Sequence, residues 1–398
     1  MSGSVTAYSA GVETTDVQLS YIAESTWATA PNSAATAIRI TGESLAGSKQ
    51  RTRPNEITGV RRVSPAVTQQ ETAGGSINFN LSYGTFDDLF AGVLGGDWGT
   101  ALNINGVAGD ITAAASGNKL TSTTAGKFTA ITVGQWIRLS GFTASSGANN
   151  GYYRVSLKTS DQDITLAGKT LANETPSGTA AQIRGAMLRN GDLVKSYFFQ
   201  KRLASNLWLR YPGTMFSGMT LSGGVGQFFS GTFQAAAKEE LNQTAGAGTG
   251  SVTAAPTGGF FDAVASFGGV QIDDTAVASV VNSVSLEVQR DGAGMDYGMG
   301  SASAQGARWG QLSVGGSVEL YFKDFTQYTL FKNETRCRVA WRMGDVAGNA
   351  YIVTLAGSNL LNPQITAGGP NQPVLARFTI EGGNDLSLPA IQIDRFAA

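Results

Sequence analysis

The chain has 398 residues, and its formal net charge of −1 argues against a protein that grips nucleic acid through a broad basic face. Histidine is absent and Cys337 is the single cysteine, which excludes Ser-His and Cys-His dyads, histidine metal sites and intrachain disulfides. Glycine is abundant (52 residues) and charged residues make up only 14%, which favours a mainly β protein with many short strands joined by turns.

The N-terminal segment 1–15 is small and polar, and is predicted to be frayed or to become ordered on assembly. It contains no basic region followed by an apolar run, and no stretch of about 18 apolar residues occurs in the chain. We therefore expect a soluble protein that is made in a cytoplasm. Two strands are expected next, at 17–27 and 38–45, around a polar connection.

A long arm follows between Gly47 and Pro65. It carries five basic residues against one acidic residue: Lys49, Arg51, Arg53, Arg61 and Arg62, with Glu56. Exposed arginines suit an acidic protein surface, so we interpret the arm as a protein–protein contact. A solvated hairpin tip is the alternative, with phosphate binding behind both. The corresponding later segment, 287–309, is glycine-rich and mixed in charge, and is expected to contact something different.

The stretch from Gly74 to Phe90 organises the chain, because its periodicity changes half-way. Apolar and polar residues alternate from Ser76 to Tyr83, which predicts a strand with one buried and one wet face. Beyond Gly84 the apolar residues take helical spacing, ending at Gly95-Gly96. The sequence thus predicts a strand, a tight turn and a short helix that lies on the sheet.

Residues 100–187 are expected to interrupt this first module as a small all-β insertion, since their strands are separated by Asn-Gly turns without a helical stripe. The first module, 1–99, then resumes over 188–240. A flexible linker is predicted at 241–259 from its Gly, Ala and Thr content, and a second module at 260–398.

The second module repeats the organising stretch 241 residues later. Gly315-Gly316-Ser317 repeats Gly74-Gly75-Ser76, and Leu330-Phe331 repeats Leu89-Phe90. Alignment of 41–90 with 282–331 gives 11 identities in 50, clustered at the turn and the apolar positions. We interpret this as an internal duplication of one module.

The sequence shows no group of residues typical of an active site. Asp87-Asp88 is expected to stabilise the start of the predicted helix, and Asp273-Asp274 to form a turn. Residues 246–250 resemble a phosphate loop only superficially, since no Lys-Ser/Thr follows. Cys337 lies in an alternating segment and is predicted to be a packed core thiol. We therefore predict a non-enzymatic building block without cofactor or metal, which assembles with itself.

Four segments also carry a family resemblance: Tyr21-Ile-Ala-Glu24-Ser-Thr with Pro31, Thr41-Gly-Glu-Ser-Leu45, Asn55-Glu-Ile57 and Leu81-Ser-Tyr-Gly-Thr-Phe-Asp-Asp-Leu89. Through them the chain closely resembles bacteriophage tail tube proteins, the major tail proteins of long-tailed siphophage-type phages with non-contractile tails. Weaker similarity continues through 190–240 and 270–398. One departure is Thr58, where the family has a basic residue; Arg61 and Arg62 are expected to take over that role.

The resemblance implies duplicated β-sandwich or half-barrel modules, each with one short helix, whose sheets join around a ring. Stacked rings would form the hollow tail tube of the virion, which conducts the genome into the host bacterium. The implied partners are further copies of the chain, tail-tip, tape-measure and tail-terminator proteins, and phage DNA in transit without sequence-specific binding; no membrane is involved. Two modules per chain favour a homotrimeric pseudo-sixfold ring, with a homohexamer as the alternative.

The wet faces of the two organising strands would line the lumen or a subunit seam: Asn78, Asn80 and Ser82, with Glu319, Tyr321 and Lys323 in the second copy. Each basic contact to phosphate would slow sliding DNA, so a neutral to negative lumen is expected. The arm is assigned to contacts between successive rings. The insertion would project outward, so that deletion between Thr100 and Gly185 should leave tubes intact.

Three other classes remain open. A tail terminator or baseplate tube homologue would share most of these features. An outer-membrane barrel would need a signal peptide and strands of about ten residues with an apolar outer face, neither of which is evident. A surface-binding adhesin or carbohydrate-active protein is the third, and an enzyme of that kind would need two carboxylates brought together in a cleft.

Overall fold

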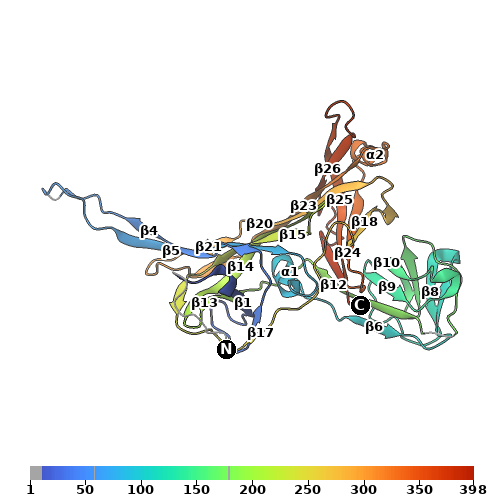
Figure 1. Cartoon of the computed structure of the whole chain (residues 1–398), viewed down its shortest axis with the longest axis horizontal. Coiled ribbons are helices and arrows are strands. Elements are labelled where there is room, and N and C mark those ends of the chain that lie inside the picture. Colours follow the sequence, from blue (N-terminus) through green and yellow to red (C-terminus); the bar gives the residue numbers. More distant parts are fainter. Residues whose placement is uncertain (1–10, 58, 178–179) are drawn as a thin grey trace, which may run out of the picture.

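The computed structural model describes residues 11–57, 59–177 and 180–398 (Figure 1). The predicted tail lies outside the described residues up to residue 10, as does Thr58. The described chain is mainly β, as predicted, and contains two α-helices, α1 (Asp87–Leu94) and α2 (Thr326–Lys332). Within these ranges no helix is long and apolar enough to cross a membrane.

An antiparallel sheet runs unbroken through the centre of the molecule (Figure 1). Its strand order is β4–β5–β15–β14–β20–β23–β26–β25, with the short β3 also paired to β5. The bounds are β3 Gly42–Glu43, β4 Ala46–Thr52, β5 Val67–Asn80, β14 Leu207–Gly224, β15 Ser230–Ala237, β20 Val281–Asp291, β23 Gln311–Tyr321, β25 Ala350–Thr366 and β26 Leu375–Glu381.

A second sheet folds over each half of this central sheet. The long strands β14 and β25 run from one layer into the other, so each half is a sandwich joined along one side. Over the first half lie β1 Gln18–Ala23, β2 Ala35–Ala37, β13 Tyr197–Ala204, β16 Leu241–Gln243 and β17 Val252–Thr253. Over the second half lie β18 Phe267–Ile272, β19 Thr275–Ala276, β24 Cys337–Gly344 and β27 Gln392–Phe396.

The strand, turn and helix occur in the predicted order, although the strand ends at Asn80, before Ser82. Ile77 and Phe79 of β5 are buried, and the Phe79 ring stacks on Phe233 with centroids 4.7 Å apart. Gly84 makes the turn with φ +77°, a left-handed conformation that glycine adopts without strain. Helix α1 ends at Gly95, whose φ of +66° gives the left-handed C-cap that stops a helix.

The two halves share one order of strand pairing. In the first half β1–β13–β14–β15–β5–β4 pair in sequence, and in the second half β18–β24–β25–β26–β23–β20 do the same. The Ser44 and Ser76 hydroxyls lie 2.9 Å apart, and so do those of Ser285 and Ser317, each 241 residues later. The common plan agrees with the sequence repeat, and the origin of the halves by duplication stays a prediction.

The all-β insertion has a hydrophobic core of its own, which includes Phe128, Ile137 and Tyr153. Its strand order is β7–β8–β11–β10–β9–β12–β6. The bounds are β6 Leu102–Asn105, β7 Ile111–Ala114, β8 Lys119–Ser122, β9 Trp136–Ser140, β10 Gly151–Ser160, β11 Asp163–Ala167 and β12 Gln182–Arg189. The boundary drawn at residue 187 falls inside β12, which pairs with β6 and β9 and, further along, with β27 of the second half.

The segment 241–259, predicted as a flexible tether, is instead packed along the first half. It contains β16, paired with β14, and β17, paired with β2. Ala247 is buried, and its amide donates to Gln200 Oε1 at 2.8 Å. The Gly- and Thr-rich composition led to the wrong prediction because small residues are also needed where two backbone segments lie close together. A Cβ on Gly248, for example, would overlap the carbonyl oxygen of Ser33.

Candidate assembly interface

The central sheet has a continuous polar face on the side opposite its core. One row of directly opposed residues crosses six strands: Asn78, Thr232, Thr220, Glu287, Gly315 and Glu381. Opposed residues in an antiparallel sheet point to the same side, so the row belongs to one face. The Thr232 hydroxyl donates to Asn78 Oδ1 at 2.8 Å across two of these strands. Both halves therefore contribute to a single wet surface.

This face carries more negative than positive charge. Away from the β4–β5 hairpin, the charged side chains on it in the described strands are Glu287, Asp291, Glu319, Glu381 and Arg377. Glu319 Oε2 accepts from Asn282 Nδ2 at 2.6 Å and from Ser283 Oγ at 3.3 Å, which fixes that carboxylate on the surface. The four carboxylates and one guanidinium give this part of the face an excess of negative charge.

Most of the residues predicted for the wet faces lie on this surface. Asn78 is exposed, Asn80 and Glu319 are partly exposed, and Tyr321 is 38% exposed at the end of β23, with Lys323 exposed just beyond it. Ser82 is different: it is buried, and its hydroxyl lies 2.7 Å from Thr85 Oγ1. The alternation ends because β5 ends at Asn80, after which the chain turns inward. Whether this surface lines a lumen stays a prediction.

The predicted basic arm is the β4–β5 hairpin, which projects from the body of the molecule (Figure 1). Three of its cations are used within the hairpin: Lys49 pairs with Glu71 at 2.6 Å, Arg51 donates to Ala66 O and Arg53 to Ser64 O. Glu56 accepts from the Ser64 hydroxyl at 3.0 Å. In the part of the hairpin that is described, Arg61 and Arg62 are exposed without a hydrogen bond or ion pair.

Helix α1 is buried between the two halves. Asp87 Oδ1 accepts from the Tyr351 hydroxyl of the second half at 2.5 Å, and Oδ2 pairs with Arg395. Asp88 Oδ2 instead accepts from Tyr21 of the first half at 2.9 Å. Burial raises the pKa of Asp87, an effect that Arg395 opposes. The two carboxylates thus tie the helix to opposite halves, a connection that its N-terminal position alone did not predict.

Helix α2 occupies the corresponding place in the second half but is left open. Of its seven described residues only Gln327 is buried, whereas seven of the eight residues of α1 are. Phe322, Phe325, Tyr328 and Phe331 form a chain of edge-to-face contacts on and beside it. The Phe325 side chain is 62% exposed. An aromatic cluster of this kind is typical of an unoccupied interface.

The central sheet ends in two strand edges of different character. Beyond Asn359, the described residues provide β25 with a partner on one side only, β26, and Ile365 is 39% exposed there. At the other end, side chains cover the outward peptide groups of the β3–β4 edge. Leu45 O accepts from Lys201 Nζ at 3.0 Å and from Tyr211 Oη at 2.9 Å, and Gly47 N donates to Glu240 Oε2 at 3.0 Å.

A comparison with known protein families identifies the family to which the chain belongs. A family model described as phage tail tube protein matches residues 14–382, most of the chain. The chain belongs to the phage tail tube protein family. As a tail tube protein it is a structural component of the phage virion. Comparison with curated proteins found no significant match.

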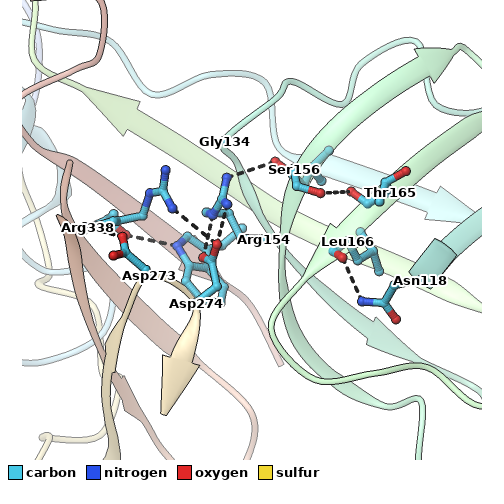
Figure 2. A network of polar contacts seen from close by, with 12 residues as sticks. Asn118, Gly134, Arg154, Ser156, Thr165, Leu166, Asp273, Asp274 and Arg338 are labelled. Carbon is cyan, nitrogen blue, oxygen red and sulfur yellow. Dashed lines mark hydrogen bonds and ion pairs between the residues drawn. The ribbon is translucent and has the colours of Figure 1, made fainter. Parts of the chain in front are cut away.

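The insertion of this tail tube protein is fixed to the second half by a largely buried ion pair (Figure 2). Arg154 of β10 donates to both carboxylate oxygens of Asp274, at 2.6 and 2.5 Å. Arg338 of β24 reaches the same carboxylate at 3.3 Å from the other side. Asp273 and Asp274 form the predicted turn, between β18 and β19, with φ of +48° and +65°. Sequence alone did not reveal their second role as an anchor.

A second contact lies where the insertion meets β25 and β27. Trp136 is buried there, its indole donates to Thr354 Oγ1 at 3.0 Å, and its backbone amide donates to Asp394 Oδ1 at 3.2 Å. Asp394 is buried, and burial raises its pKa to about 8. The insertion of the tail tube protein is therefore held by strand pairing, an ion pair and a tryptophan, and not by its two chain connections alone.

Cys337 lies in the core of the tail tube protein, as predicted. It is 3% exposed at the start of β24, and burial raises its pKa to about 12. A thiol of this kind stays protonated and inert at neutral pH. Among the described residues, no group of three or more Cys, Asp or Glu side chains is placed to hold a metal ion.

Proposed function

We propose that this chain assembles with copies of itself into rings, and that the rings stack into the tube through which the phage genome passes. The observation that carries the proposal is the central sheet, which has a polar face on one side and an unpaired strand edge at its β25 end. An exposed edge invites pairing with another chain, and closure around a ring removes the edges altogether.

The dimensions favour three chains per ring. Three chains would supply three times eight central strands. With about 4.8 Å between strands and a tilt of about 40°, a closed sheet of that size is about 48 Å across at the backbone. This width admits a DNA duplex with side chains on every side. A ring of three chains would also have nearly sixfold symmetry, because the two halves of each chain present nearly equivalent surfaces.

The polar face is the surface that would line the bore. Its excess of carboxylates keeps phosphate contacts few, so that DNA passes without binding tightly. The basic hairpin, with Arg61 and Arg62 at its exposed end, would then reach the neighbouring ring. The insertion lies at the far side of the second half from the hairpin and would decorate the outside of the tube (Figure 1).

Electron microscopy of the concentrated protein, with and without tail-tip complexes as nuclei, tests this function. Tubes whose axial class averages show three-fold symmetry with six lobes are the expected result. Six full-size protomers per ring would keep the tube and overturn the trimer. Single rings that never stack would favour a tail terminator. A protein that forms no ring even on tail-tip complexes would overturn the proposal.

A further inference from the structure

Within the described residues, the two halves of the central sheet join where β14 of the first half pairs with β20 of the second. Thr220 lies opposite Glu287, Leu221 opposite Leu286 and Ser222 opposite Ser285. Helix α1 packs over this junction, and Arg290 of β20 donates to Val93 O at the end of the helix at 3.2 Å. The junction thus has two parts, a strand ladder and a helix capped from the neighbouring module.

The outer strands of the central sheet correspond to the two strands of this junction. Strand β25 occupies in the second half the place of β14, because each pairs with the equivalent strand, β26 or β15. Gly75 pairs with Ala235, and its equivalent Gly316 pairs with Ile380. Counting the paired residues along the strands from these two starting points shows that Ile365 of β25 is equivalent to Leu221 of β14. The 241-residue offset likewise places Leu45 where Leu286 lies.

We propose that the β25 edge of one copy pairs with the β3–β4 edge of the next copy in the register of the internal junction. Gln364 then lies opposite Ala46 of the next copy, Ile365 opposite Leu45, and Thr366 opposite Ser44. The proposal rests on the proposed function, since it names the seam that closes the ring. The chemistry repeats that of the internal junction: Leu–Leu becomes Ile–Leu, and Ser–Ser becomes Thr–Ser.

The helices support the same seam independently. In the internal junction α1 is covered by the second half, whereas the aromatic cluster of α2 is uncovered. The first half of the next copy would cover α2 in the same way. Lys49 stands 241 residues before Arg290, on the same side of its strand. It would exchange its partner in the free chain, Glu71, for the last carbonyls of α2, which it would cap as Arg290 caps those of α1. This gives Lys49 a role within the ring.

The seam requires an exchange of hydrogen bonds at Leu45. In the isolated chain its carbonyl accepts from Lys201 and Tyr211, and its amide donates to Glu43 Oε2 at 2.8 Å. The equivalent groups of Leu286 face β14 in the internal junction. Pairing with Ile365 would replace these side chains by backbone groups. Pro363 has no N–H to donate, so the first pair of backbone hydrogen bonds exchanged across the seam would be that of Ile365 with Leu45.

A disulfide between the two edges tests the register. Gln364 and Ala46 are exposed in the free chain and would form a non-hydrogen-bonded pair, whose Cα atoms approach to about 4.5 Å, within the range for a disulfide. Tubes of the Ala46→Cys/Gln364→Cys variant, grown under reducing conditions and then oxidised, should give bands of two and three chains on a non-reducing gel. The buried Cys337 should not react.

The matched control is Ala46→Cys/Thr366→Cys, which shifts the pair by two residues and should remain a single chain on the gel. Normal tubes that cross-link in this control, and not in the proposed pair, would overturn the register and leave the tube function standing. Wild-type protein that forms no rings would remove the function and the seam together.

Hydrogen exchange on unmodified tubes provides a second measurement. Peptides that cover 43–47 and 361–368 should exchange at least tenfold more slowly in tubes than in the free chain, because backbone bonds would replace solvent or side chains there. Equal exchange of the 361–368 peptide in the two states would overturn the seam even if the cysteine variants failed to assemble.

Discussion

The anchor of the insertion can be tested by replacing Asp274 with asparagine. The change preserves the size of the side chain and removes the charge that Arg154 and Arg338 share. The side chains of Arg154 and Asp274 are only 10% and 14% exposed, so water can replace the lost interactions only in part. Burial and the neighbouring Arg154 already lower the pKa of Arg338, and the variant leaves the two cations facing each other.

The expected cost follows from that burial. Removal of one partner from a buried ion pair typically costs about 3–5 kcal/mol. The 23% exposure of Arg338 allows part of its charge to be hydrated, which places the expected loss near the lower end, about 3 kcal/mol. Urea unfolding followed by tryptophan fluorescence measures this loss, because Trp136 and Trp341 lie in the core clusters on the two sides of the contact.

Asp161→Asn is the matched control, since Asp161 also pairs with a cation of the insertion, Lys158, but its side chain is 51% exposed. Its unfolding curve should be close to that of the wild type. Removing one surplus cation by Arg338→Gln in the Asp274→Asn background should recover part of the loss. If Asp274→Asn were no more destabilising than Asp161→Asn, the ion pair would not anchor the insertion.

Three further predictions concern pH, assembly and backbone packing. Burial raises the pKa of Asp394 to about 8, so at neutral pH the folded chain keeps a proton that the unfolded chain has released above about pH 4. The free energy of unfolding should therefore fall as the pH rises from about 4 to about 8, by up to about 1.4 kcal/mol per pH unit. Asp394→Asn should flatten this slope in urea titrations, and an unchanged slope would contradict the assignment. Charge reversal in Arg61→Glu/Arg62→Glu should abolish tube growth without shifting the Tm of the free chain; normal tubes would show that the arm is dispensable. Gly316→Ala should cost roughly 1–3 kcal/mol because its Cβ would overlap Ser285 O, whereas Gly259→Ala, with open space around it, should be neutral.

Local structure could be predicted from the sequence wherever one period dominates. The alternation through Ile77 and Phe79 and the helical spacing after Gly84 gave the correct strand, turn and helix, because each depends on neighbours in the chain. Ser82 failed the same rule. Its position continues the alternation, but the strand has ended and its hydroxyl pairs with Thr85. A period shows which face is buried and does not show where a strand stops.

Contacts between distant segments were beyond the sequence. Asp274 lies in a two-residue turn, and its positive φ is sufficient to explain an aspartate at this position. The local sequence therefore gives no sign that Arg154, 120 residues away, pairs with it. The packing of 241–259 was missed for a similar reason, since small residues occur both in flexible linkers and where two backbone segments pack closely. The pairing of β14 with β20 could not be predicted either, because the alternation of apolar and polar residues in each strand does not indicate which strand is its partner.

Placing the β14–β20 junction inside one polypeptide changes how a ring can grow and diversify. Three chains of this kind close a ring of six modules in only two association steps, whereas six single-module chains would need five. The two modules of one chain also meet at a high effective concentration because they are covalently linked. Two linked halves are also free to differ. The long hairpin and the insertion occur once per chain, so around such a ring each repeats at every second module, leaving the alternate positions bare.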